Sequence, residues 1–354
     1  MLTRIVAATS LLAFLPAQAP NITSPTVVRT RAVWFVEGEN PIGAEVGFAH
    51  DKTPADATVS QTLADAKPGA RIALGTTFWP ALETFTDLKF GNVAVKAGNY
   101  YAVLERGKQG WSLGLLDPEK VRGAQLPPGI AKGQPLVAAI PLTPAERPAG
   151  DLQVDWEGDS QPDTITLAIG IGKHVLRATA TVRGAGGNAP LVFPDQRGTS
   201  RLCLGPSDAA KVPCLVVDHG KVAWNDKLDK QARSLAVGKR WRLGKDWATT
   251  LDTNVPLVLG GKKVAAGSWH LTMARSKDGW NLVLSSAEAD HRARIDGFGA
   301  DFVQAAIEVP LAKSAANPAA ENLQVGFEQQ GGKTELVITF GPERFAVAIA
   351  PPKS

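Results

Sequence analysis

The feature of this sequence that most constrains its fold is a self-similarity at one constant spacing. The segment 97–101 (Ala-Gly-Asn-Tyr-Tyr) resembles the segment 266–270 (Ala-Gly-Ser-Trp-His), 169 positions later. The same spacing joins further pairs: Gly75 and Gly244, Trp111 and Trp280, Pro141 and Pro310, Gly172 and Gly341, and His50 and His219. The segment 152–157 also matches 323–328 after a slip of two residues. A unit this long can own a core, so the sequence predicts two tandem copies of one domain of roughly 150 residues.

The boundary between the predicted copies follows from local composition. The stretch 184–198 is rich in Gly and Pro and lacks an apolar period, which is typical of a linker. We therefore expect an N-terminal extension over 20–29, a first, degenerate domain over 30–183 and a second domain over 199–350.

Within each predicted copy, apolar side chains alternate with polar ones, as in 323–327 and 336–340. A period of two places one face of a strand inward and the other toward water. Turn sequences separate these runs, and Gly and Pro, at 35 and 25 residues, are too frequent for long helices. We predict an all-β fold of two tandem antiparallel β-sandwich or open-barrel domains, with a short helix near 228–235.

The first residues have the pattern of a secretory signal peptide over 1–19. Arg4 supplies the positive charge, residues 5–16 are apolar, and Ala17-Gln18-Ala19 forms a small-x-small cleavage site. No run in the chain reaches the ~20 apolar residues of a membrane helix. We predict cleavage near Ala19 and a periplasmic or extracellular location without a transmembrane segment.

Cys203 and Cys214 are the two cysteines, and they flank a turn-rich segment. Strands leaving that loop can bring the sulfurs together, and an oxidising compartment would close a disulfide. A pair of buried free thiols is the alternative. No second Cys or His pair nearby has zinc-ligand spacing, so we predict no metal site. The net charge of +4 is spread along the chain, which does not favour nucleic acid as a partner.

One set of segments in the second copy resembles a known family. The run 238–244 (Gly-Lys-Arg-Trp-Arg-Leu-Gly) is followed in order by Ala248-Thr249-Thr250, Gly261-Lys262-Lys263, Ala266-Gly267-Ser268-Trp269, Gly279-Trp280 and Val309-Pro310-Leu311. Together they resemble the signature of domain-of-unknown-function family 2911. The resemblance covers nearly all of the second copy and, through the 169 spacing, a degenerate first copy.

That family is mostly bacterial and exported and has no established activity. The resemblance therefore implies compartment and domain extent and adds no chemistry. Asp246-Trp247 stand where the family has Asn-Glu, and Ile72 and Ala73 stand in the first copy where the second has Trp and Arg.

The ligand-binding candidates are therefore concentrated in the second copy: Arg242, Asp246, Trp247, Thr249, Thr250 and His219. A guanidinium at Arg242 can bind a carboxylate or phosphate in a bidentate manner, or it can form a structural ion pair with Asp246 or Asp252. His50 and His219 are expected at strand ends on the inward face, a setting more typical of core histidines than of ligands. His270 and Asp246 are weak catalytic candidates.

The sequence holds no Gly-x-Ser-x-Gly, no His-Glu-x-x-His and no glycine-rich phosphate loop, and it indicates no cofactor. Our first hypothesis is a non-enzymatic extracytoplasmic module that binds a small molecule, a glycan or an envelope protein. One alternative is a hydrolase-like enzyme that uses Arg242, Asp246, Thr249 and His270. Another is a carbohydrate-binding module, because Trp79, Trp247 and Trp269 lie in or near predicted loops and can stack on sugar rings.

Overall fold

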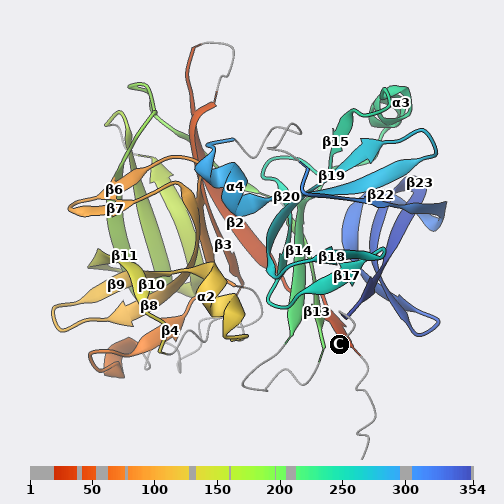
Figure 1. The fold of residues 1–354 in the computed structure, drawn as a ribbon. Coiled ribbons are helices and arrows are strands. Elements are labelled where there is room, and N and C mark those ends of the chain that lie inside the picture. The colour runs from red at the N-terminus through yellow and green to blue at the C-terminus, as the bar shows by residue number, and fades with distance from the viewer. Residues whose placement is uncertain are drawn as a thin grey trace, which may run out of the picture.

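The computed structural model describes residues 20–37, 42–52, 63–75, 79–126, 133–158, 161–195, 197–204, 213–295 and 305–351. The predicted signal peptide, 1–19, lies outside these residues. The described chain is all-β, as predicted, and its strands pair in antiparallel fashion in three sheets (Figure 1). No helix in the described part is long and apolar enough to cross a membrane.

The eleven-stranded sheet belongs mainly to the first half of the chain. Its strands run, in spatial order, β12 (Leu191–Asp195), β2 (Val27–Phe35), β3 (Ile42–Asp51), β5 (Ala81–Thr84), β8 (Gly98–Arg106), β9 (Trp111–Leu116), β10 (Leu136–Gly158), β11 (Thr164–Val182), β6 (Leu88–Phe90) and β7 (Val93–Val95), with β4 (Arg71–Ala73) on β8. The long strand β10 pairs with β9 through residues 136–142 and with β11 through residues 143–158, so it carries the sheet from one layer into the next.

The second half forms two sheets. The eight-stranded sheet contains β1 (Asn21–Thr23), β13 (Arg197–Cys203), β14 (Cys214–Gly220), β16 (Thr249–Thr253), β19 (Gly267–Arg275), β20 (Trp280–Ser286) and β21 (Ile307–Pro310), with β15 (Arg240–Arg242) on β19. The four-stranded sheet contains β18 (Lys262–Val264), β17 (Leu257–Leu259), β23 (Lys333–Ala350) and β22 (Ala312–Gln330). Helices α2 (Pro118–Gly123), α3 (Asp226–Ser234) and α4 (Ala287–Arg292) lie in the described part of the chain, and residues 63–65 are also helical. The predicted helix near 228–235 thus corresponds to α3.

The described residues form four apolar clusters, of which three are large. One core fills the first half and includes Trp34, Phe48 and Leu104, and a second fills the second half around Leu271 and Leu284. A third cluster joins the halves, because it combines first-half and second-half residues: Val27, Ala49, Trp79, Ala81, Tyr101, Val103, Leu116, Val121, Cys203, Cys214 and Val216. The alternating pattern in the sequence therefore corresponds to stacked sheets. Each half has two apolar interfaces, one within the half and one with the other half.

The elements of the two halves recur at the spacing seen in the sequence. The first residues of β4 and β15, β6 and β17, β7 and β18, β8 and β19, β9 and β20, α2 and α4, and β11 and β23 are each 169 positions apart. We call two residues with this spacing counterparts. Even an unusual backbone conformation is shared, since Gln125 and its counterpart Arg294 have φ angles of 53° and 56°.

In each half, one strand of the sheet comes from the segment that precedes the other half in the sequence. Strand β1, at the N-terminal end of the described chain, pairs with β13 of the second half, and Ile22 lies opposite Leu202. Strand β12, which comes just before the second half, pairs with β2 of the first half, and Leu191 lies opposite Val33. Ile22 and Leu191 are counterparts, and so are Val33 and Leu202. The two strands therefore make the same pairing in the two halves, and the exchange is reciprocal. The predicted linker 184–198 consequently contains strand β12.

Cys203 and Cys214 are cross-strand partners in β13 and β14 and form a disulfide, with their Cα atoms 4.4 Å apart. The bridge therefore ties the two strands at the end that carries the connecting loop. It lies in the cluster between the halves.

Candidate functional site

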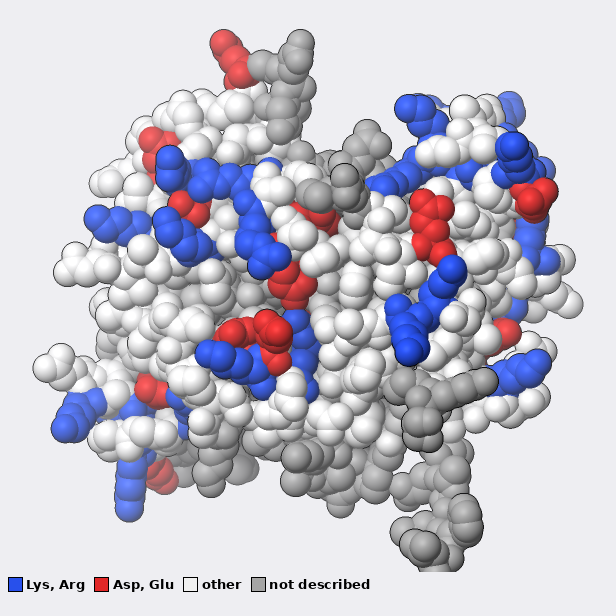
Figure 2. Space-filling view, viewed as in Figure 1, with Lys and Arg blue, Asp and Glu red and all other residues white. Residues whose placement is uncertain are grey.

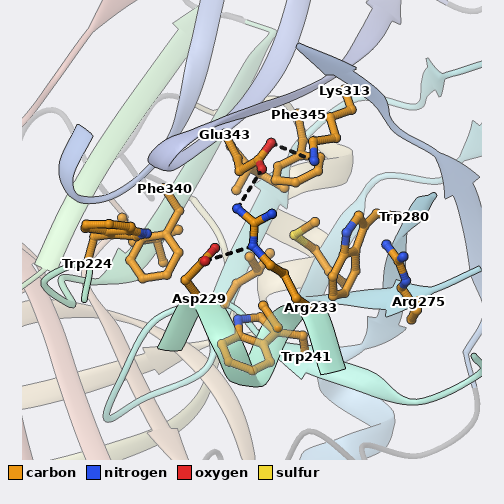
Figure 3. Close-up of a pocket in the computed structure, with 15 residues that line it drawn as sticks. Trp224, Asp229, Arg233, Trp241, Arg275, Trp280, Lys313, Phe340, Glu343 and Phe345 are labelled. Carbon is orange, nitrogen blue, oxygen red and sulfur yellow. Dashed lines mark hydrogen bonds and ion pairs between the residues drawn. The ribbon is translucent and has the colours of Figure 1, made fainter. Parts of the chain in front are cut away.

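A pocket opens in the second half between the eight-stranded and the four-stranded sheet, under helix α3 (Figure 3). Its volume is about 180 Å³. It is lined by Trp224, Asp229, Ala232, Arg233, Trp241, Leu243, Met273, Arg275, Trp280, Lys313, Leu323, Ile338, Phe340, Glu343 and Phe345.

The apolar wall of the pocket comes from side chains of both sheets. Trp241 of β15 and Met273 of β19 are cross-strand partners and point the same way, into the space between the layers. Trp280 of β20 meets Phe345 of β23 edge to face, with ring centroids 6.3 Å apart and an angle of 71°. At one end the Trp224 ring packs so closely on Gly341 that a side chain at Gly341 would collide with it.

The mouth of the pocket carries charges. Arg233 of α3 lies 2.8 Å from Asp229 and 3.5 Å from Glu343, and Glu343 also lies 2.8 Å from Lys313 (Figure 3). Arg275 lines the same pocket and stacks on Trp280, with its guanidinium carbon 5.4 Å from the ring centroid. Three cations and two carboxylates therefore surround an apolar interior.

Helix α3 covers the pocket without being part of the core. Asn225 caps it by accepting a hydrogen bond from the backbone N–H of Leu228 at 3.0 Å. None of its residues is buried, and Ala232 is its only residue packed, partly buried, against the core of the second half. The helix is therefore held by side-chain ion pairs and a small apolar contact, which are weak attachments.

One position in α3 differs in side-chain size between the two halves. The counterpart of Ala232 is Leu63, which is 6 % exposed and belongs to the core of the first half. The second half thus has an alanine at the pocket where the first half has a buried leucine. Comparing the two halves position by position would have shown this difference in the sequence.

The residues predicted from the sequence do not line this pocket, and several of them lie where the two halves meet. Arg242 neighbours Trp241 on β15 and faces the opposite way. Burial lowers the pKa of Arg242 to about 10, the carboxylate of Glu45 opposes this shift, and the nearby Arg197 adds to it. Asp246, whose φ is 63°, accepts a hydrogen bond from Arg31 of β2 at 3.2 Å.

Trp247, Thr249 and Thr250, which follow Asp246 in the sequence, are also buried and contact other protein groups. Trp247 is fully buried, with the guanidinium of Arg29 5.1 Å from its ring centroid and the Phe85 ring at 5.2 Å. The Thr249 hydroxyl donates to the carbonyl of Leu243 at 2.5 Å. Thr250 is buried in β16, between Asp218 of β14 and His270 of β19.

His270 is part of a buried acid–histidine cluster. Its Nδ1 lies 2.6 Å from a carboxylate oxygen of Asp290, and both side chains are fully buried. The ring of His291 lies 5.5 Å from that of His270. Burial, aided by His270, lowers the pKa of His291 to about 3, so this imidazole is neutral at pH 7. Full burial keeps a substrate away from the His270–Asp290 pair in this conformation.

His219 and His50 join the layers of their respective halves. The Nε2 atom of His219 accepts the backbone N–H of Val325 at 3.2 Å, and that of His50 accepts the N–H of Val154 at 3.3 Å. Burial, aided by the nearby Arg197, lowers the pKa of His219 to about 4. Both imidazoles thus act as neutral acceptors for a strand of the facing layer.

The ionic network at this interface was not predicted from the sequence. Arg29 lies 2.9 Å from Glu83 and 3.2 Å from Asp218, Arg31 lies 2.8 Å from Glu45, and Arg197 lies 2.9 Å from Asp218. All six side chains are buried. The available signal was the placement of Arg29 and Arg31 at alternate positions of an otherwise mostly apolar strand. Among the described residues, no group of three or more His, Cys, Asp or Glu side chains is arranged to hold a metal ion.

The structure thus defines an all-β protein with a small covered pocket in its second half. Residues 224–349 match the family described as "Protein of unknown function (DUF2911)". The match confirms the resemblance for the second half, and it includes α3 and every residue that lines the pocket. No curated protein and no solved structure matches the chain.

Proposed function

We propose that this protein is an exported, non-enzymatic binding protein whose second half takes up a small molecule under helix α3. The ligand has an apolar part about the size of one aromatic ring and an anionic group. The observation that carries this proposal is the apolar pocket with a charged mouth. Its volume of about 180 Å³ exceeds the ~150 Å³ of an apolar cavity that admits benzene.

The charges at the mouth favour an anion. Arg233, Arg275 and Lys313 outnumber the two carboxylates, Asp229 and Glu343. Arg233 and Lys313 already share Glu343, whereas Arg275 stacks on Trp280 at the pocket wall. A carboxylate or sulfonate on the ligand would complete the charge balance and accept hydrogen bonds from Arg275.

Two tandem copies of one domain, with the ligand pocket kept only in the second, account for the paired features of the halves. Besides the shared strand positions, His50 and His219 make the same backbone hydrogen bond in the two halves. Arg106 stacks on Trp111 at 5.5 Å, as Arg275 stacks on Trp280. In this proposal the first domain, over 30–183, is a scaffold whose core is filled by Leu63.

Export is supported by the Cys203–Cys214 disulfide, because such bridges persist in oxidising compartments. The hydrolase-like alternative requires Arg242, Asp246, Thr249 and His270 to converge on a substrate. Each of the four instead contacts protein groups between the halves or within the second half, which is why we propose binding and not hydrolysis.

The test is calorimetric titration of residues 20–354 with 3-phenylpropanoate, an apolar ring joined to a carboxylate, alongside the neutral 3-phenylpropanol. We expect the acid to bind more tightly than the alcohol and to quench tryptophan fluorescence. Ala232→Leu, which copies the first half, should weaken binding at least tenfold. Gln231→Leu is the matched control, because it adds the same side chain to an exposed position of the same helix.

Two results would contradict the proposal. One is an unchanged affinity in the Ala232→Leu variant. The other is the absence of binding by either compound at millimolar concentration.

A further inference from the structure

We propose that the protein has a second ligand site, for a neutral saccharide, in the cleft where the two halves meet. The cleft has a volume of about 530 Å³ and is lined by β8 and α2 of the first half and by β19 and α4 of the second. This volume falls within the roughly 300–1,000 Å³ of small-molecule sites. Acidic and basic side chains gather side by side in the middle of one face, between the two lobes (Figure 2).

Two aromatic rings, one from each half, line this cleft at counterpart positions. Tyr100 donates its hydroxyl hydrogen bond to the carbonyl of Lys96 at 3.0 Å, and Trp269 donates its indole N–H to the carbonyl of Ala265 at 3.2 Å. In both cases the acceptor lies four residues earlier. Both rings are partly exposed and are thus held in place before any ligand arrives.

Aromatic rings that are fixed by hydrogen bonds in this way are suited to binding a sugar. The faces of a pyranose carry C–H groups, which pack favourably on the electron-rich face of an aromatic ring. Because the polar edges of Tyr100 and Trp269 are already bonded to the protein, their remaining surface is apolar. Each ring packs with one part against the core of its own half and lines the cleft with the part that stays exposed.

A buried amide that lines the same cleft lacks hydrogen-bond partners. Asn99 lines the cleft and is 6 % exposed, and in the described part of the chain neither its Oδ1 nor its Nδ2 has a hydrogen-bond partner. Leaving a buried amide unpaired is unfavourable. A hydroxyl group both donates and accepts, so a sugar hydroxyl that enters beside Asn99 can satisfy either atom.

The charges in the cleft favour a neutral ligand. Arg122 is fixed between Asp252, at 3.3 Å, and Glu288, at 2.6 Å, and so its charge is already balanced. Asp117, Glu119 and Arg292 also line the cleft, and the carboxylate of Asp117 lies 3.9 Å from the ammonium group of Lys120. Planar carboxylates and guanidinium groups held in this way hydrogen-bond to hydroxyls that lie in the plane of a sugar ring.

The experiment titrates residues 20–354 calorimetrically with four neutral hexasaccharides, built from β-linked glucose, α-linked glucose, N-acetylglucosamine and xylose. We expect at least one of them to bind with a Kd below 1 mM. Trp269→Ala should weaken that binding at least tenfold, and Trp269→Phe, which keeps a ring, should weaken it less than threefold. Asn99→Ala should also weaken it at least threefold.

The controls separate this site from the pocket under α3. Ala232→Leu should leave saccharide binding unchanged, and Trp269→Ala should leave 3-phenylpropanoate binding unchanged. Circular dichroism and the melting temperature of each variant report whether it folds, and Asn99→Ala keeps the test valid if Trp269→Ala does not fold. The proposal is overturned if none of the four saccharides binds at 10 mM, or if the bound one is insensitive to the folded variants among Trp269→Ala and Asn99→Ala.

Discussion

The guanidinium of Arg122, on α2 of the first half, lies 3.3 Å from the carboxylate of Asp252, on β16 of the second half. Their counterparts, His291 on α4 and Glu83 on β5, also lie within range of an electrostatic interaction across the halves. In both places a basic side chain of a short helix thus interacts with an acid of the opposite half. In one pair the base is a charged arginine, and in the other it is a neutral histidine.

Replacing Arg122 by Met should destabilise the protein by about 3 kcal/mol, because it leaves the half-buried carboxylates of Asp252 and Glu288 without the charge that compensates them. Burial raises the pKa of Asp252 to about 6, so most of this carboxyl is ionised at pH 7 and needs its partner. Urea denaturation at pH 7 measures the change. Lys120→Met, on the exposed side of the same helix, should change the free energy of unfolding by less than about 0.5 kcal/mol. A loss below 1 kcal/mol for Arg122→Met would contradict the role we assign to this pair.

The stability of the protein should fall as the pH is lowered from 6.5 toward 4. The folded-state pKa of His219, about 4, lies below the unfolded value of 6.5, so below pH 6.5 the unfolded chain binds the proton that the folded chain excludes. This one histidine should contribute a loss of about 1.4 kcal/mol per pH unit in that window. His219→Gln keeps an acceptor for the N–H of Val325 and should flatten the profile by that amount. The exposed His174→Gln should leave the profile unchanged, and an equal slope in the His219→Gln protein would refute the assignment.

Reducing the disulfide should lower the stability by about 2 to 3 kcal/mol, the value expected for closing a loop between cysteines 11 positions apart. Thermal unfolding with and without dithiothreitol measures this effect. The double variant Cys203→Ala and Cys214→Ala should melt at the lower temperature under both conditions. If the reductant lowers its melting temperature too, the effect does not come from the bridge.

Ala232→Leu should stabilise the unliganded protein by about 1 kcal/mol, since the added side chain enters an apolar pocket and removes hydrocarbon from water. Gln231→Leu, which points to solvent, should leave the free energy of unfolding within about 0.5 kcal/mol. Urea denaturation compares the two variants with the parent protein. A destabilised Ala232→Leu protein would mean that the pocket cannot accept the extra volume.

The all-β fold was predictable because period-two alternation, as in Leu323, Val325 and Phe327, depends only on near neighbours in the chain. The disulfide was predictable for the same reason, since Cys203 and Cys214 flank one turn. The prediction of a site around Arg242 and Asp246 followed from the resemblance to the family. The structure puts both side chains against the first half, through Glu45 and Arg31, and local sequence carries no information on that contact.

The pocket under α3 could not be predicted from the sequence, for a different reason. Its walls come from Trp224, Trp241, Trp280 and Phe345, which are spread over more than a hundred positions, and its volume depends on how completely they fill the space. The ionic network was equally hidden, because an arginine at every second position of a strand ordinarily indicates a face toward water. Here a second sheet covers that face, as the burial of Arg29 and Arg31 shows.

The exchange of β1 and β12 means that the two halves are interlocked by backbone hydrogen bonds and not merely tethered. A protease that cut the chain at Gly186-Gly187 would not by itself release two independent proteins, because the N-terminal fragment would still hold an edge of the C-terminal one and the reverse. In this respect the molecule resembles a heterodimer whose two subunits are joined in one chain.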